Sequence, residues 1–252
     1  MTPSVYVLEY HLVNYRRTWR SSAFSSLVLP LLTMLGFGLG VGSFVTGGVE
    51  GVPYLQWMVP GLIASTAAQV AVAESTWPVM SCFTWVKSYF AQAAAPLRPA
   101  DILGGHVAFM LFRVLASAAA FLMVAFCFGA LRSGWSLLVL PIALLLGAAL
   151  APLVAAYTAS VTTDMYLAVL FRFAVLPMSL FSGVFFPIES LPTGLRWVAL
   201  ALPLSHGVDL SRAATLGLDP GPGAVWQVLY LLAWAVAGWF LASWRYRRRL
   251  VI

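Results

Sequence analysis

Five long stretches of this chain carry no charged side chain. They cover residues 21–49, 51–73, 114–131, 133–163 and 220–244. A helix needs about 20 consecutive apolar residues to cross the hydrocarbon core of a bilayer. The composition agrees, because 62% of the residues are hydrophobic and 9% are charged, against roughly 25% charged residues in an ordinary soluble domain. The sequence therefore excludes a water-soluble globule and predicts an all-α integral membrane protein.

A sixth span is less regular than the other five. Residues 165–186 are apolar apart from Arg172 and contain Pro177. The third span begins near residue 103, so that Arg113 lies inside it. We therefore predict a single transmembrane domain over residues 1–252, with six spans at about residues 22–43, 54–74, 103–128, 135–158, 165–183 and 224–244.

The positions of the basic residues predict the orientation. With both termini in the cytoplasm, nine of the fourteen Lys and Arg residues lie on the cytoplasmic side, where short loops rich in these residues stay. Three lie outside, and the other two, Arg113 and Arg172, lie within spans. The arginine-rich tail at residues 244–249 begins where the last span ends, so we interpret it as a topology anchor that contacts membrane lipid, not as a nucleic-acid site.

The segment before the first span has helical periodicity. Apolar and aromatic residues recur at helical spacing over residues 3–20, with Arg16 and Arg20 to one side. This pattern is typical of a helix in the inner membrane interface. A simple N-terminal extension of the first span fits the pattern equally well.

Two connecting segments are too apolar to be open loops. The cytoplasmic segment 75–101 is rich in Trp, Tyr and Phe, which indicates either an interfacial helix or a surface for a protein partner. Residues 183–206 are broken by Gly and Pro but include an apolar stretch at 195–202. Irregular backbone at membrane depth must be buried in protein or line a cavity, so we predict a re-entrant outer segment here.

Motifs for catalysis and cofactor binding are missing from the sequence. It contains no phosphate-binding loop, and the single lysine, Lys87, has no glycine near it. The three histidines, His11, His106 and His206, are too scattered to predict a metal site, and the eight carboxylates show no acid–base pairing. We expect no catalytic residue, no metal ligand and no cofactor bound by this chain.

Two arginines within spans are exceptions in an otherwise apolar interior. An arginine at the membrane centre costs at least about 2.5 kcal/mol on insertion scales, so Arg113 and Arg172 each require a compensating environment. Glu74 and Asp164 are the available partners for structural ion pairs. The alternative is that the arginines line a polar translocation path.

Two segments resemble those of the type-2 ABC transporter permeases, the family that includes drug-resistance and nodulation-factor exporter subunits. The first is FSGVFFPIESLP at residues 181–192, which continues through LPLSH at residues 202–206 to Arg212. The second is APLRPADILGG at residues 95–105. Residues 77–85 depart from the family pattern, because they lack the charged, glycine-containing lead of many members.

This resemblance implies a permease in the bacterial inner (plasma) membrane that pairs with a second copy of itself or with a related permease. It implies two separate ABC ATPase subunits, which bind the ATP and Mg²⁺. The resemblance assigns ATPase coupling to the segment 75–101, with Phe83, Trp85, Lys87, Tyr89, Phe90, Pro96 and Arg98 as its site residues. It assigns closure of the outer mouth to Ser182, Gly183, Phe186, Pro187, Pro192 and Pro203.

Export of a hydrophobic or amphipathic substrate follows from the same resemblance, and antibiotic resistance is among the roles it suggests. The aromatic-rich, charge-poor spans suit a drug, a lipid or a glycolipid equally well. An ATP-independent secondary carrier or channel remains the alternative and predicts an essential charge within the membrane. A membrane-embedded enzyme or scaffold would need a reactive cluster that the sequence does not show.

Overall fold

The computed structural model describes residues 3–40, 48–49, 51–219, 221 and 223–251. Apart from one isolated bridge between Val49 and Val52, the regular structure of these residues is helical. The elements are α1 (Pro3–Thr33), η1 (Met34–Gly40), α2 (Tyr54–Ser75), α3 (Trp77–Thr84), α4 (Ser88–Ala93), α5 (Pro99–Cys127), η3 (Gly134–Leu138), α6 (Val139–Thr158), α7 (Met165–Leu170), η4 (Phe171–Val175), α8 (Leu176–Phe181), η5 (Ile188–Ser190), α9 (Thr193–Ala201), α10 (Pro203–Leu216) and α11 (Gly223–Leu250).

The chain is a multi-pass membrane protein with at least four helical segments long and apolar enough to cross a bilayer. These segments are Tyr54–Thr84, Pro99–Cys127, Gly134–Thr158 and Gly223–Leu250. They coincide with four of the predicted spans. Helices suit this environment because each satisfies its own backbone hydrogen bonds. Met165–Phe181, where the sequence predicted the fifth span, is also apolar but belongs to the shorter helices, those of 10–17 residues.

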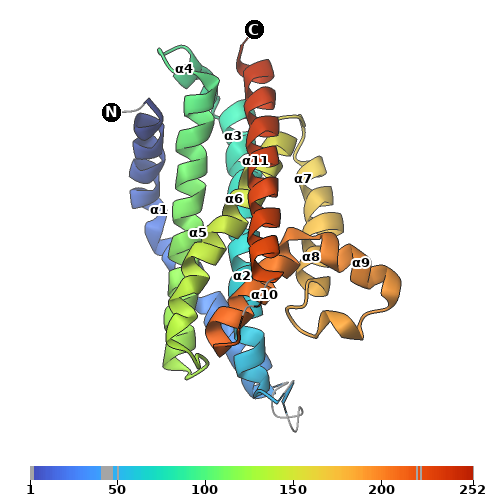
Figure 1. Cartoon of the computed structure of the whole chain (residues 1–252). Helices are drawn as coiled ribbons and strands as arrows, with labels where there is room; N and C mark the ends of the chain where they lie inside the picture. The colour runs from blue at the N-terminus through green and yellow to red at the C-terminus, as the bar shows by residue number, and fades with distance from the viewer. Residues whose placement is uncertain (1–2, 41–47, 50, 220, 222, 252) are drawn as a thin grey trace.

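Helix α2 lies at the centre of the bundle. It packs against α5, α6 and α10, while α11 packs mainly against α6 (Figure 1). In the most apolar stretch of Tyr54–Thr84, 72% of the residues are buried, against 11% in the corresponding stretch of α11. Large apolar side chains on the outside of α11, among them Trp226 and Phe240, are therefore exposed on the surface of the chain.

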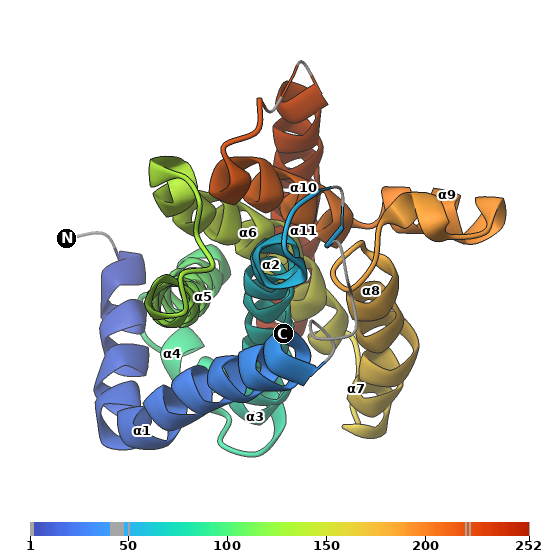
Figure 2. The ribbon, with the colours of Figure 1, turned by 90° about the horizontal axis from the view of Figure 1, so that it is seen from below.

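The N-terminal helix is continuous. The sequence predicted a boundary between an interfacial helix at residues 3–20 and a first span that begins at about residue 22, and the structure has no break there. Pro3–Thr33 is one helix, and Figure 2 shows that it bends and that its second half crosses in front of α3 in that view. Its first half packs along the start of α5, where a side chain at Gly105 would collide with the backbone oxygen of Ser4. Residues 41–43, the end of the predicted first span, lie outside the described residues.

The segment after α8 folds back towards the bundle instead of forming an extended loop. α9 extends sideways, and α10 returns to pack against α2 and α6. In Figure 1, both helices lie at heights between the two ends of α5.

Candidate functional site

The segment that the sequence assigned to ATPase coupling folds into a helical hairpin made of α3 and α4. The chain leaves the helical conformation at Thr76 (φ −104°, ψ −97°), and the Thr76 hydroxyl donates to the carbonyl of Val72 at 3.0 Å. Pro78 in the first turn of α3 suits the new helix start. The tip, residues 85–87, turns at Lys87, which has the only positive φ among the described non-glycine residues. We call residues 77–93 the coupling hairpin.

The predicted coupling residues divide into buried anchors and an exposed tip. Phe83 and Tyr89 are buried, whereas Trp85 is 60% exposed and Lys87 is also exposed. Phe90 is half-buried. Pro96 and Arg98 are exposed between the hairpin and α5. A large aromatic side chain held in the open on anchored backbone is suited to bind a protein partner.

The anchors connect the hairpin to two long helices. The Tyr89 hydroxyl hydrogen-bonds to Nδ1 of His106 on α5 and lies 3.3 Å from the hydroxyl of Tyr246 on α11. Phe83 packs edge-on against both tyrosine rings. The Arg249 guanidinium lies 4.4 Å from the Phe83 ring centroid. The hairpin is therefore anchored directly to α5 and α11.

Arg249 also connects this cluster to the end of α6. Its Nη1 donates to the carbonyl oxygens of Ala159 at 2.9 Å and Val161 at 3.2 Å. A helix C-terminus leaves carbonyls without partners, and a cationic side chain satisfies them well. The hairpin, α6 and α11 thus share one set of contacts.

The two span arginines have different environments. Arg113 Nε donates to Glu74 Oε1 at 2.9 Å, and its guanidinium lies 4.7 Å from the ring centroid of Tyr15. Both charged side chains are less than one-fifth exposed. Arg172 on η4 is exposed and makes no hydrogen bond or ion pair within the described part of the chain. The structure therefore pairs one arginine and leaves the other facing outward.

Replacing Glu74 with Gln should destabilise the chain. An uncompensated buried charge costs about 3–5 kcal/mol, so we expect a clear fall in the melting temperature of the detergent-solubilised protein. The double variant Glu74→Gln/Arg113→Gln should recover part of that loss because it leaves no unpaired charge. Equal melting temperatures for Glu74→Gln and the wild type would contradict a stabilising pair.

The outer motif is held by an arginine from α10. Arg212 Nη2 donates to the carbonyl of Gly183 at 2.7 Å, and the guanidinium lies 3.9 Å from the Trp57 ring centroid. Asp209 lies 3.8 Å from Nη1. Gly183 has φ +77°, a conformation that favours glycine. Arg212 therefore ties the turn after α8 to both α10 and α2.

The other residues of the outer motif surround this turn. Ser182 is buried, and Phe186 and Pro187 are partly buried. Pro192 is exposed immediately before α9, and Pro203 is the buried first residue of α10. The two prolines occupy helix starts, where a missing N–H costs nothing. The motif thus comprises the turn after α8 and the starts of α9 and α10, and of these two helices α10 packs against α2.

Sequence reasoning missed several residues that organise these sites. His106 and Tyr246 were not chosen, because their partner Tyr89 is 17 and 157 residues away along the chain. Arg212 was noted only as the end of a motif. A basic residue inside an otherwise apolar, proline-bounded segment is a signal that could have identified it.

The histidines correct one expectation. The sequence described all three as scattered, but the rings of His11 and His106 stack with centroids 3.9 Å apart. His206 lies elsewhere and bonds to the carbonyl of Leu200. In the described residues, no group of three or more His, Cys, Asp and Glu side chains is arranged to hold a metal ion.

Known proteins resemble this chain over most of its length. Residues 5–216 match the profile of a family described as ABC-2 type transporter. Nodulation protein J of Rhizobium leguminosarum bv. trifolii is 30% identical over 237 residues, which cover 92% of this chain and 90% of that protein. Nodulation protein J of Sinorhizobium fredii is 29% identical over 242 residues, covering 94% and 91%. The corresponding protein of Rhizobium meliloti is 27% identical over 237 residues, covering 94% and 90%.

Proposed function

The chain belongs to the ABC-2 type transporter family, and from that premise we propose that it is the permease subunit of an ATP-driven exporter in the bacterial inner membrane. In this proposal ATP and Mg²⁺ are bound by separate ATPase subunits. The observation that carries it is the coupling hairpin, whose exposed Trp85 is fixed to the bundle by the buried Phe83 and Tyr89. This arrangement suits a partner that pushes on the hairpin.

The finer topology belongs to the same proposal. We take the hairpin and both chain ends as cytoplasmic, with six spans and a re-entrant outer segment at α9 and α10. Two features support it: four long apolar segments coincide with predicted spans, and α9 and α10 lie at levels covered by α5. The Arg212 contacts would then hold the outer mouth closed until the spans tilt.

A second permease would cover the outward face of α7, η4 and α8. Large apolar side chains on this face are exposed, among them Met165 (73%) and Phe173 (77%). Arg172 lies beside Phe173 on the π-helical segment η4 and is exposed; with six spans it would lie within the fifth. Because a charged side chain avoids lipid, this face would border a polar path between two permeases. Irregular turns of this kind are frequent at functional sites.

Replacing Arg172 with Leu should reduce transport strongly while the ATPase subunit still binds. The substitution removes a charge that has no partner in the described chain, so the melting temperature should stay within a few degrees of the wild type. Arg172→Lys retains the charge and should retain most transport. Wild-type transport by Arg172→Leu would contradict a role in lining the path.

Reconstitution distinguishes the exporter from the alternative carrier. The purified chain is placed in proteoliposomes with or without its ATPase subunit, and movement of a fluorescent acylated oligosaccharide is followed. We expect movement only with both proteins and hydrolysable ATP. Equal movement by the chain alone would support the ATP-independent carrier and remove the exporter proposal.

A further inference from the structure

An apolar groove of about 640 Å³ lies between the end of α5 and the start of α6. One wall is a stripe of α5 residues three or four positions apart, Ala119, Leu122, Met123 and Phe126. The stripe is about 10 Å long, at about 1.5 Å of helix per residue. Because α5 is one of the segments long enough to cross a bilayer, the groove runs in the same direction as the lipid chains.

The apolar side chains of the groove are exposed on the surface of the chain. Met123 is 59% exposed and Phe126 is 74% exposed, and Leu137 in the opposite wall is 67% exposed. Figure 2 shows α5 and the start of α6 on the other side of α2 from α7 and α8, the helices that the second permease would cover. With the second permease there, the groove faces the hydrocarbon of the bilayer.

A cationic side chain lies at the end of this groove. Arg132 lines the groove and is exposed, and within the described residues it makes no side-chain hydrogen bond or ion pair. It comes shortly after Cys127, the last residue of α5, so it lies at the level of the lipid headgroups when α5 crosses the bilayer. A basic side chain at that level attracts an anionic headgroup.

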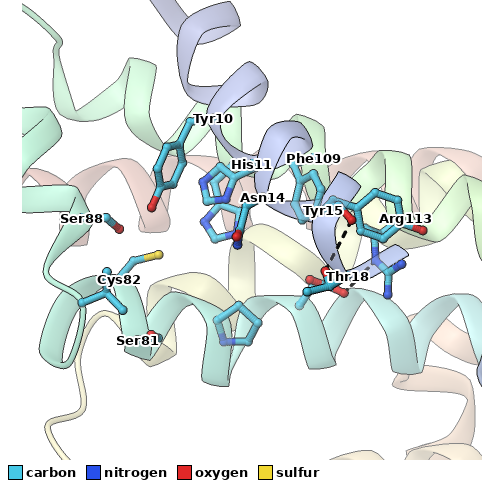
Figure 3. Close-up of a pocket in the computed structure, with 14 residues that line it drawn as sticks. Tyr10, His11, Asn14, Tyr15, Thr18, Ser81, Cys82, Ser88, Phe109 and Arg113 are labelled. Carbon is cyan, nitrogen blue, oxygen red and sulfur yellow. Dashed lines mark hydrogen bonds and ion pairs between the residues drawn. The ribbon is translucent and has the colours of Figure 1, made fainter. Parts of the chain in front are cut away.

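Arg113 shows the contrast with a neutralised arginine. It lines the cavity between α1, the coupling hairpin and α5, where Figure 3 shows it beside Tyr15. Its Nε donates to Glu74 at 2.9 Å, so its charge is compensated within the chain. The charge of Arg132 has no such partner in the described part of the chain and is open to a ligand.

Hydrogen bonds hold the turn that carries Arg132. The backbone N–H groups of Arg132 and Ser133 both donate to the carbonyl of Thr215 on α10, at 3.3 and 3.1 Å. The Ser133 hydroxyl, which also lines the groove, accepts from the backbone N–H of Trp135 and keeps its own hydrogen for another acceptor. A guanidinium and a hydroxyl group together suit the oxygens of a phosphate.

A second apolar groove lies on the other side of α6 and differs in charge. It measures about 600 Å³ and lies between α6, α10 and α11. The charged residue in its wall is Asp219, whereas the first groove has Arg132. An acyl chain suits both grooves, but a negatively charged phosphate is attracted only to the first. Charge complementarity therefore selects an anionic lipid for the groove beside Arg132.

We propose that the groove between α5 and α6 binds one anionic phospholipid. An acyl chain lies along the stripe on α5, and the phosphate contacts the Arg132 guanidinium and the Ser133 hydroxyl. The site is at the end of the bundle opposite the coupling hairpin (Figure 1), which the proposed topology places in the outer leaflet. Because the turn is bonded to Thr215, the headgroup is attached to the outer segment through α10.

Photo-crosslinking tests the site locally. The full chain is placed in phosphatidylcholine nanodiscs with a trace of phosphatidylglycerol or phosphatidylcholine that carries the same photoreactive acyl chain, and labelled residues are found by mass spectrometry. Residues 223–236 of α11 are the reference, because they contain no charged residue and expose Val225 and Trp226. We expect the preference for phosphatidylglycerol at residues 119–137 to exceed that at the reference about fivefold, the effect of one arginine near an anionic headgroup.

Four variants separate the headgroup contact from the groove. Arg132→Gln should remove the preference, and Arg132→Lys should retain most of it. Arg196→Gln removes an exposed arginine on α9 and should leave the preference unchanged. Ala119→Phe fills the groove from an exposed position and should lower labelling by both probes. All three positions are exposed, so the melting temperatures should stay within a few degrees of the wild type.

Three outcomes would overturn the proposal. An equal preference at the groove and at the reference would show that the groove faces bulk lipid without recognising a headgroup. A preference that survives Arg132→Gln would remove the assigned contact. Absence of labelling by either probe would show that another part of the assembly covers the groove. The export function is tested separately, because lipid labelling requires neither the ATPase nor ATP.

Discussion

Replacing Trp85 with Ser should release the ATPase subunit from this chain. The side chain is 60% exposed at the tip of the coupling hairpin, so its loss leaves the buried anchors Phe83 and Tyr89 intact. Loss of a central aromatic anchor at a protein interface costs about 2 kcal/mol or more, or roughly 30-fold in affinity. We expect the amount of ATPase that co-purifies in detergent to fall accordingly, and transport to fall with it.

Trp135→Ser is the matched control. Trp135 is 68% exposed and lies on η3, which leads into α6. In Figure 1 the start of α6 is at the end of the bundle opposite the coupling hairpin. The same chemical change there should leave the ATPase bound. If both variants retained the ATPase equally, docking on the hairpin tip would be wrong. If both lost it, the effect would reflect general destabilisation.

Replacing Arg212 with Ala should loosen the outer motif. The change removes a 2.7 Å charge-assisted hydrogen bond to the Gly183 carbonyl and the cation–π contact with Trp57. Together these amount to about 3 kcal/mol, given about 1.5–3 kcal/mol for a hydrogen bond to a charged group and about 0.5–2 kcal/mol for a cation–π contact. We expect faster amide hydrogen exchange over residues 183–191 and a lower melting temperature.

Two further variants make this result specific. Arg212→Lys retains the charge but cannot reproduce the planar guanidinium, so it should restore only a minor part of the protection of residues 183–191 from amide hydrogen exchange. Arg196→Ala removes an exposed arginine on α9 and should change neither the amide exchange over residues 183–191 nor the melting temperature. Wild-type exchange over residues 183–191 in Arg212→Ala would show that this arginine does not hold the turn.

Some of this architecture could be read from the sequence because membrane crossing depends on length and apolarity alone. The long segments containing α2, α5, α6 and α11 lie where charge-free runs predicted spans. The course of α1 could not be predicted, because its apolar stripe fits a helix at the interface and an N-terminal extension of the first span equally well. The sequence also did not predict the bend before its second half, which Figure 2 shows.

The sites, too, could be predicted only in part. Aromatic residues at 75–101 indicated either an interfacial helix or a contact surface, but periodicity could not show that Phe83 and Tyr89 are buried while Trp85 is exposed. Arg113 had two possible carboxylate partners in the sequence, and only the packing of α2 against α5 selects Glu74. The contacts of Arg212 join segments that are far apart along the chain, so no local pattern contains them.

Co-purification from the native locus tests the central claim most directly. The tagged chain is isolated in mild detergent, and the eluate is examined for a second protein and for ATP hydrolysis. The proposal predicts a soluble ABC ATPase in the eluate, with ATP turnover, and loss of both when Trp85 is replaced by Ser. A chain that elutes alone, without ATP turnover, yet transports in liposomes would contradict it.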